Sequence, residues 1–154
     1  MQLSENFSFE EMTTTEHRDL LDQNRKEAEY FTPELARLAR EVLEPIRALV
    51  GGPVVVHSGF RSNALNQAVG GSTTSQHSYG EAADTVYPGR SLTEIYNLIM
   101  ASNIPFGQLI FEFGEWVHVS CQDPGRYPGK VRQCLRADRV NGATVYSSVT
   151  APLA

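Results

Sequence analysis

Cysteine and positive charge are both scarce in this sequence of 154 residues. The two cysteines, Cys121 and Cys134, lack CxxC spacing, which excludes a four-cysteine zinc site and a disulfide scaffold, so we expect free thiols. Thirteen Lys and Arg residues oppose eighteen Asp and Glu residues. The resulting net charge of −5 argues against nucleic acid as the main partner.

Long apolar runs are missing as well. No stretch approaches the roughly 18 apolar residues of a membrane span, and the opening MQLSENFSFEEM lacks the basic start and apolar run of a signal peptide. We therefore expect synthesis in the cytoplasm, no signal peptide and no membrane span. With 41% hydrophobic residues, the chain fits one domain, residues 1–154, and we expect a monomer.

The apolar pattern predicts an α+β fold, with helices packed beside a small, mostly antiparallel sheet. Residues 1–31 form a polar segment that is helical or irregular, and residues 32–135 contain the core. Residues 136–154 contain an Asn-Gly hairpin turn and a loose C-terminal tail. Three apolar runs predict strands, namely PVVVHSGF, FGQLIFEF and WVHVSCQ, the last two forming a hairpin.

Two helices carry the clearest signals. Residues 32–50 repeat apolar residues at helical spacing, with Thr32 expected as the cap and Pro33 in the first position. Pro45 lies within this pattern and is expected to bend the helix or cost it a hydrogen bond. In SLTEIYNLIMAS, Ser91 is expected to cap the second helix.

Two of the four histidines invite no metal hypothesis. His17 lies among polar residues, where we expect exposure, and His57 lies at a strand end, where a structural hydrogen-bonding role is at least as well supported as a functional one. His118 is different because it alternates with apolar residues in a strand and shares a face with Trp116.

His77 and Asp84 lie seven residues apart in the small-residue stretch GGSTTSQHSYGEAADTVYP. Gly80 would let the chain turn after His77, and the alanines before Asp84 would let it pass close to a site. Catalytic zinc takes three protein ligands, which His118 would complete. From the residues alone, a metal site and a polar surface loop beside a core histidine both remain open.

The same stretch carries a family resemblance. Five residues match the SxHxxGxAxD pattern of the zinc D-alanyl-D-alanine carboxypeptidase family, the M15 peptidases: Ser75, His77, Gly80, Ala82 and Asp84. WVHVS resembles that family's third-ligand strand, and SGFRSNALN resembles its SGYRS segment. The likeness runs from NFSFEEM to VRQCLRA and is closest to the small single-domain branch of phages and bacteria, with a hedgehog-like fold.

The resemblance implies roles for these residues. His77, Asp84 and His118 would bind Zn²⁺, and Arg61 would hold the substrate carboxylate or stabilise the oxyanion. An exposed arginine at a helix start is the alternative for Arg61. Three further residues are candidate substrate contacts, namely Ser75, Tyr79 and Trp116. Packing in the core is the more common role for the two aromatic residues, and a hydrogen bond to nearby backbone or to the outer edge of a metal ligand is the alternative for Ser75.

A general base is also required, and two glutamates compete for that role. Glu115 reproduces the ExxH spacing before His118 that is seen in part of the family. If residues 113–115 form a turn, Glu112 lies opposite Trp116 and on the same face as His118, whereas Glu115 would point away in a regular strand. We favour Glu112, although a β-bulge would reverse the choice.

The sequence thus predicts a zinc peptidase that hydrolyses peptidoglycan stem peptides, as a D-Ala-D-Ala carboxypeptidase or an endopeptidase at a D-amino-acid bond. Without a signal peptide, it would be a phage-type cell-wall-degrading enzyme, released through a membrane lesion or carried on a particle. Two other hypotheses remain, a non-catalytic hedgehog-like zinc-binding module and a structural component of a phage tail.

Overall fold

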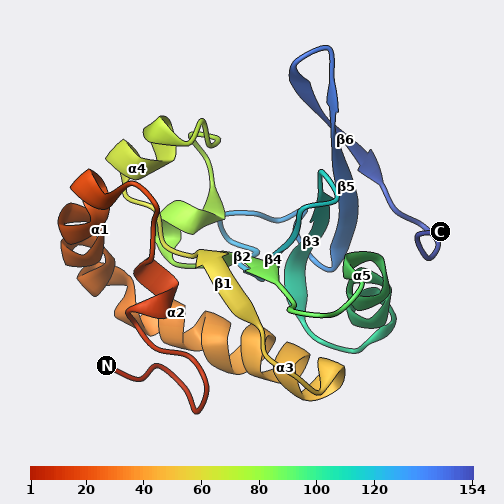
Figure 1. Cartoon of the computed structure of the whole chain (residues 1–154), viewed down its shortest axis with the longest axis horizontal. Helices are drawn as coiled ribbons and strands as arrows, with labels where there is room; N and C mark the ends of the chain where they lie inside the picture. The colour runs from red at the N-terminus through yellow and green to blue at the C-terminus, as the bar shows by residue number, and fades with distance from the viewer.

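Six strands form one sheet in the computed structural model, which describes residues 1–154 (Figure 1). The strands are β1 Val55–Ser58, β2 Ala82–Val86, β3 Phe106–Glu112, β4 Trp116–Cys121, β5 Gln133–Val140 and β6 Ala143–Ser148. Their order is β1-β2-β4-β3-β5-β6, and only the β3–β5 pair is parallel. The α+β architecture with a mostly antiparallel sheet is therefore confirmed.

The helices outside the sheet are short. The α-helices are α1 Leu21–Ala28, α2 Thr32–Leu38, α3 Glu44–Val50, α4 Asn63–Ala68 and α5 Leu92–Ala101. Shorter turns are η1 Glu11–Thr13, η2 Arg18–Leu20, η3 Glu29–Phe31, η4 Ala39–Leu43 and η5 Gln76–Tyr79. Ser91 caps α5 as expected, since its hydroxyl accepts the Glu94 N–H at 3.3 Å. None of these helices combines the length and the apolar character needed to cross a membrane.

The run from α2 to α3 differs from the expected helix in its cap, and it is irregular near Pro45 as expected. Thr32 is not its cap, because the preceding turn η3 leads directly into α2 and the Thr32 hydroxyl donates to the Glu29 carbonyl instead. Pro45 is accommodated by η4, a π-helical segment just before it, where the wider turn tolerates the missing N–H. Gly51, with a φ of 66°, ends the run.

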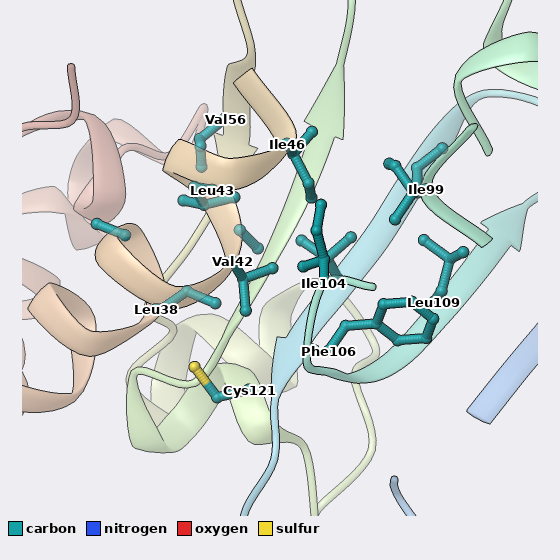
Figure 2. Close-up of a cluster of buried hydrophobic side chains, with 14 of the residues drawn as sticks. Leu38, Val42, Leu43, Ile46, Val56, Ile99, Ile104, Phe106, Leu109 and Cys121 are labelled. Atoms are coloured by element: carbon teal, nitrogen blue, oxygen red, sulfur yellow. The ribbon is translucent and has the colours of Figure 1, made fainter. Parts of the chain in front are cut away.

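The two faces of the sheet differ in what covers them. One face packs against the α2–α3 run and α5, and its core residues meet in Figure 2: Leu38, Val42, Leu43, Ile46, Val56, Ile99, Ile104, Phe106, Leu109 and Cys121. Cys121 and Cys134 are free thiols, as expected. Side chains alternate between the two faces along a strand. In β3 and β4 the side chains that do not enter this core therefore point to the opposite face, which the helices leave open.

Both predicted hairpins form. Residues 113–115 make the turn between β3 and β4, so that Glu112 pairs with Trp116 and Ile110 with His118. Asn141 and Gly142 connect β5 to β6 with φ values of 51° and 79°, the left-handed conformations that a two-residue turn requires.

The C-terminal segment is not the loose tail that its composition predicts. The Asn97 side chain of α5 donates to the Leu153 carbonyl at 2.9 Å and accepts the Leu153 N–H at 2.8 Å. Val149 also donates its N–H to Cys134 in β5. The tail is therefore fixed beside α5 and β5 by hydrogen bonds to its backbone. No local sequence pattern predicts these bonds.

Glu81, the residue before β2, has a buried carboxylate that lies 3.6 Å from Arg126 Nη1 and 3.9 Å from Arg37 Nη1. Burial, with the negative charge of Asp123, raises the pKa of Glu81 from its ordinary 4.5 to about 7. The folded protein thus retains a proton that the unfolded chain releases. The free energy of unfolding should therefore fall as the pH rises from about 4.5 to about 7.

Replacing Glu81 with glutamine is expected to remove this fall in the free energy of unfolding, because the amide is neutral at every pH. The midpoint of thermal unfolding should be about 2–4 °C above that of the unmodified protein at pH 8 and unchanged at pH 5. Glu41→Gln is the matched control, since Glu41 pairs with Arg37 on the surface. A midpoint that Glu81→Gln lowers at pH 8 would contradict the argument.

Candidate active site

His77 is held in a fixed orientation by its backbone and its ring. The Ser75 hydroxyl accepts the His77 N–H at 3.1 Å and starts the short turn η5, which Gly80 ends with a φ of 70°. The ring Nδ1 lies 2.6 Å from the Gly59 carbonyl, which can only accept. Nδ1 therefore carries the hydrogen and Nε2 keeps its lone pair, in a buried place where it has no hydrogen-bond partner.

Asp84 and His118 come together through strand pairing, because they are opposite each other in the antiparallel β2–β4 register. Asp84 Oδ1 lies 3.1 Å from His118 Nδ1 and 3.3 Å from His77 Nε2. The ligand atoms of all three residues lie within 4.8 Å of one another, and all three residues are buried. The structure thus gathers the three predicted metal ligands into one cluster that could hold a metal ion.

The protonation of the cluster suits a cation. Burial lowers the pKa of His77 below its ordinary value, which favours the neutral imidazole that a metal requires. Burial alone would raise the pKa of Asp84, but His77 and His118 outweigh it and keep that carboxyl ionised. A carboxylate, an unpartnered imidazole nitrogen and a second imidazole form a donor set that fits a divalent ion with mixed nitrogen and oxygen ligands.

Glu112 lies at the edge of this cluster, with Oε1 3.7 Å from His118 Nδ1. Burial raises the pKa of Glu112, and the electrostatic influence of the neighbouring His118 and Arg61 opposes that rise. Glu115 does not reach the cluster: its carboxylate is 56% exposed and pairs with Arg139 at 3.0 Å. Glu115 belongs to the turn and lines the neighbouring cavity rather than the one that contains the cluster, so the geometry favours Glu112 as the glutamate beside the metal ligands.

Arg61 faces the cluster from the segment before α4. Its backbone N–H donates to the His77 carbonyl at 3.0 Å, and its Nη2 donates to Ser75 Oγ at 3.4 Å. The guanidinium Nε is buried and has no hydrogen-bond partner. Burial lowers the pKa of Arg61, while Asp84 and Glu112 counteract that effect. A partly buried guanidinium with a free N–H is suited to bind an anionic group.

These side chains line one open cavity of about 530 Å³. Its lining includes Arg61, Ser75, His77, Asp84, Gln108, Ile110, Glu112, Trp116, His118, Lys130, Leu135, Arg139, Thr144 and Tyr146. A second cavity, of about 490 Å³, shares Arg61 and Trp116 with the first and extends along residues 14–16 and 57–58. Trp116 thus lies where the two cavities meet.

The structure supports some of the remaining expectations for single residues and not others. Ser75 lines the cavity and positions His77, whereas Tyr79 does not line it. The Tyr79 ring packs edge-on against Phe31 and beneath the Arg126 guanidinium, 3.7 Å away, so its expected contact with substrate is not supported. His57 is exposed as part of β1, and its ring lies edge-on to Trp116, with centroids 5.2 Å apart. His17 is exposed, as expected.

Sequence reasoning missed two parts of the site. The first is the Gly59 carbonyl that orients His77; a Cβ at Gly59 would lie 2.3 Å from the Met12 carbonyl oxygen, so only glycine fits there. Its place in SGFRS was the available signal. The second is the β5–β6 hairpin, which contributes Arg139, Thr144 and Tyr146 to the cavity. Its turn was predicted, but no pattern indicated that β5 would pair with β3.

Comparison with models of protein families identifies a related family. A family model described as Peptidase M15 matches residues 5–120, well over half of the chain. The matched range contains the cluster, Arg61 and Glu112, and it ends before β5 begins. None of the curated proteins compared with the chain matches it.

Proposed function

The chain belongs to the M15 peptidase family, and on that premise we propose that it is a zinc-dependent peptidase that hydrolyses peptidoglycan stem peptides. One observation carries the proposal: the buried cluster of His77, Asp84 and His118 shares a cavity with a partly buried glutamate, Glu112, and a partly buried guanidinium, that of Arg61. A structural metal site is typically closed by four protein ligands, whereas three ligands beside a cavity suit catalysis.

His77 Nε2, an oxygen of Asp84 and His118 Nδ1 would hold the zinc ion. When bound, zinc supplies Lewis acidity, which polarises a carbonyl and lowers the pKa of water. Glu112 accepts the proton of the attacking water and delivers it to the leaving amine nitrogen, since it lies on the same face as His118 and next to it. Arg61 binds the substrate carboxylate or the oxyanion that develops at the scissile carbonyl.

Two cleavage modes fit this arrangement. A guanidinium close to the cluster suits the terminal carboxylate of a D-Ala-D-Ala peptide and hence a carboxypeptidase. The second cavity, which shares Arg61 and Trp116 with the first, leaves room for a longer chain and favours an endopeptidase at a D-amino-acid bond. The likeness of SQHSYGEAAD and WVHVS to the small phage and bacterial branch supports a phage-type cell-wall-degrading enzyme.

Chelation tests the proposal directly. The zinc-loaded protein is expected to release D-alanine or new amino termini from purified peptidoglycan, to lose that activity with a chelator, and to regain it with added zinc. Product analysis by mass spectrometry identifies the bond. Stoichiometric zinc without any cleavage would contradict the enzyme and favour a hedgehog-like binding module. Absence of both zinc binding and cleavage would leave a structural phage protein.

A further inference from the structure

The register of the sheet places four residues in one row across four strands. Trp116 in β4 pairs with Glu112 in β3, Glu112 pairs with Ala137 in β5, and Ala137 pairs with Tyr146 in β6. Paired residues in a sheet project to the same face. Tyr146 therefore lies on the face that carries the cluster, separated from Glu112 only by the small side chain of Ala137.

The surroundings of Tyr146 are those of a cleft wall. It lines the same cavity as Glu112, yet the residue is 56% exposed, so a molecule in the cavity can reach it. Burial and the negative charges of Glu112 and Asp84 raise the pKa of Tyr146, which keeps the phenol protonated and able to donate a hydrogen bond. No hydrogen bond within the protein involves this hydroxyl, which leaves it free for a ligand.

The β5–β6 hairpin, which carries Tyr146, is fixed to the β3–β4 hairpin. Phe113 donates its N–H to the Ala137 carbonyl at 2.9 Å. The Arg139 guanidinium lies 3.8 Å from the Phe113 ring centroid and pairs with Glu115 at 3.0 Å. In Figure 1 the β5–β6 hairpin rises past the ends of β3 and β4. These contacts hold the hairpin in place, so that it forms a wall at one side of the cavity.

We propose that the β5–β6 hairpin, which lies outside the family-matched residues 5–120, is a wall of the substrate cleft and that Tyr146 is a substrate-binding residue. The proposal rests on the peptidase function proposed above. The phenol donates to a backbone carbonyl of the bound stem peptide, and the ring packs against a small apolar side chain such as the alanine methyl. Contact at this wall holds the peptide beside Glu112.

The test separates binding from chemistry. Tyr146→Phe removes only the hydroxyl and is expected to raise KM about three- to tenfold, the range of one lost hydrogen bond. Tyr146→Ala removes the ring as well and should raise KM further, while kcat stays within about twofold because the interaction is the same in the ground and transition states. Tyr30→Phe, an 88% exposed tyrosine outside the cavity, is the matched control and should match the unmodified protein.

Peptide binding, measured by calorimetry with zinc-loaded Glu112→Gln protein and a D-Ala-D-Ala stem peptide, gives a readout that does not depend on cleavage. Adding Tyr146→Ala to this variant is expected to weaken binding. Unchanged KM and unchanged binding in both Tyr146 variants would overturn the assignment even when the unmodified protein cleaves. So would a loss of kcat alone with a lowered unfolding midpoint, which indicates a structural role. Failure of the unmodified protein to cleave overturns the peptidase, whereas failure to bind the peptide overturns both proposals.

Discussion

Replacing Asp84 with asparagine is expected to abolish peptidase activity and to weaken zinc binding by at least about a hundredfold. Losing a residue that only hydrogen-bonds to a metal ligand costs up to about a hundredfold in metal affinity, and Asp84 is itself a proposed ligand. Asp84 Oδ1 lies within 3.3 Å of a nitrogen of both histidines, so it is the atom through which the cluster is assembled. The amide keeps the shape of the side chain but removes the negative charge that balances a divalent ion. Zinc content after dialysis and calorimetric titration with zinc measure the effect.

Asp138→Asn is the matched control, because Asp138 is a half-buried aspartate on β5 that pairs with Arg136 away from the cluster. It is expected to keep one zinc ion per chain and full activity. Circular dichroism of both variants shows whether the fold persists without metal. An Asp84→Asn protein that folds and still holds one zinc ion at full affinity would show that the cluster is not the metal centre.

The parts of this site that sequence reasoning could reach are those that depend on short-range geometry. A three-residue turn after Glu112 fixes the register of β3 and β4, and that register alone places Glu112 on the face of His118. The left-handed Gly80 after η5 is similarly local. In contrast, Asp84 meets His118 only because β2 pairs with β4, a contact between distant segments that the local patterns leave open and that only the family resemblance implied.

The expectations that differ from the structure share a physical cause. Glu115 was a candidate because of its ExxH spacing to His118, but it pairs with Arg139 from β5. Tyr79 was a candidate for the substrate groove, but it packs against Phe31 and Arg126 from distant segments. Tyr146 shows the converse case. Its strand was predicted from the Asn-Gly turn, yet its place beside the cavity follows from the parallel pairing of β5 with β3, which no hairpin pattern encodes.

Replacing Glu112 with glutamine is expected to lower kcat by about 10²–10⁴-fold, the usual contribution of a general base. The amide cannot accept the proton of water, whereas its size and its place near His118 are retained. Because Glu112 does not belong to the three-residue cluster, the variant should still bind zinc. Activity on the stem peptide and zinc content, measured on the same preparation, separate a lost base from a lost metal.

Glu115→Gln supplies the comparison that decides between the two glutamates. Its carboxylate is exposed and paired with Arg139, so kcat should stay within about threefold of the unmodified protein, as for a surface pair of little energetic value. Loss of activity in Glu115→Gln with full activity in Glu112→Gln would reverse the assignment. That result would require residues 113–115 to rearrange when substrate binds, since in the present geometry only Glu112 shares the face of the cluster.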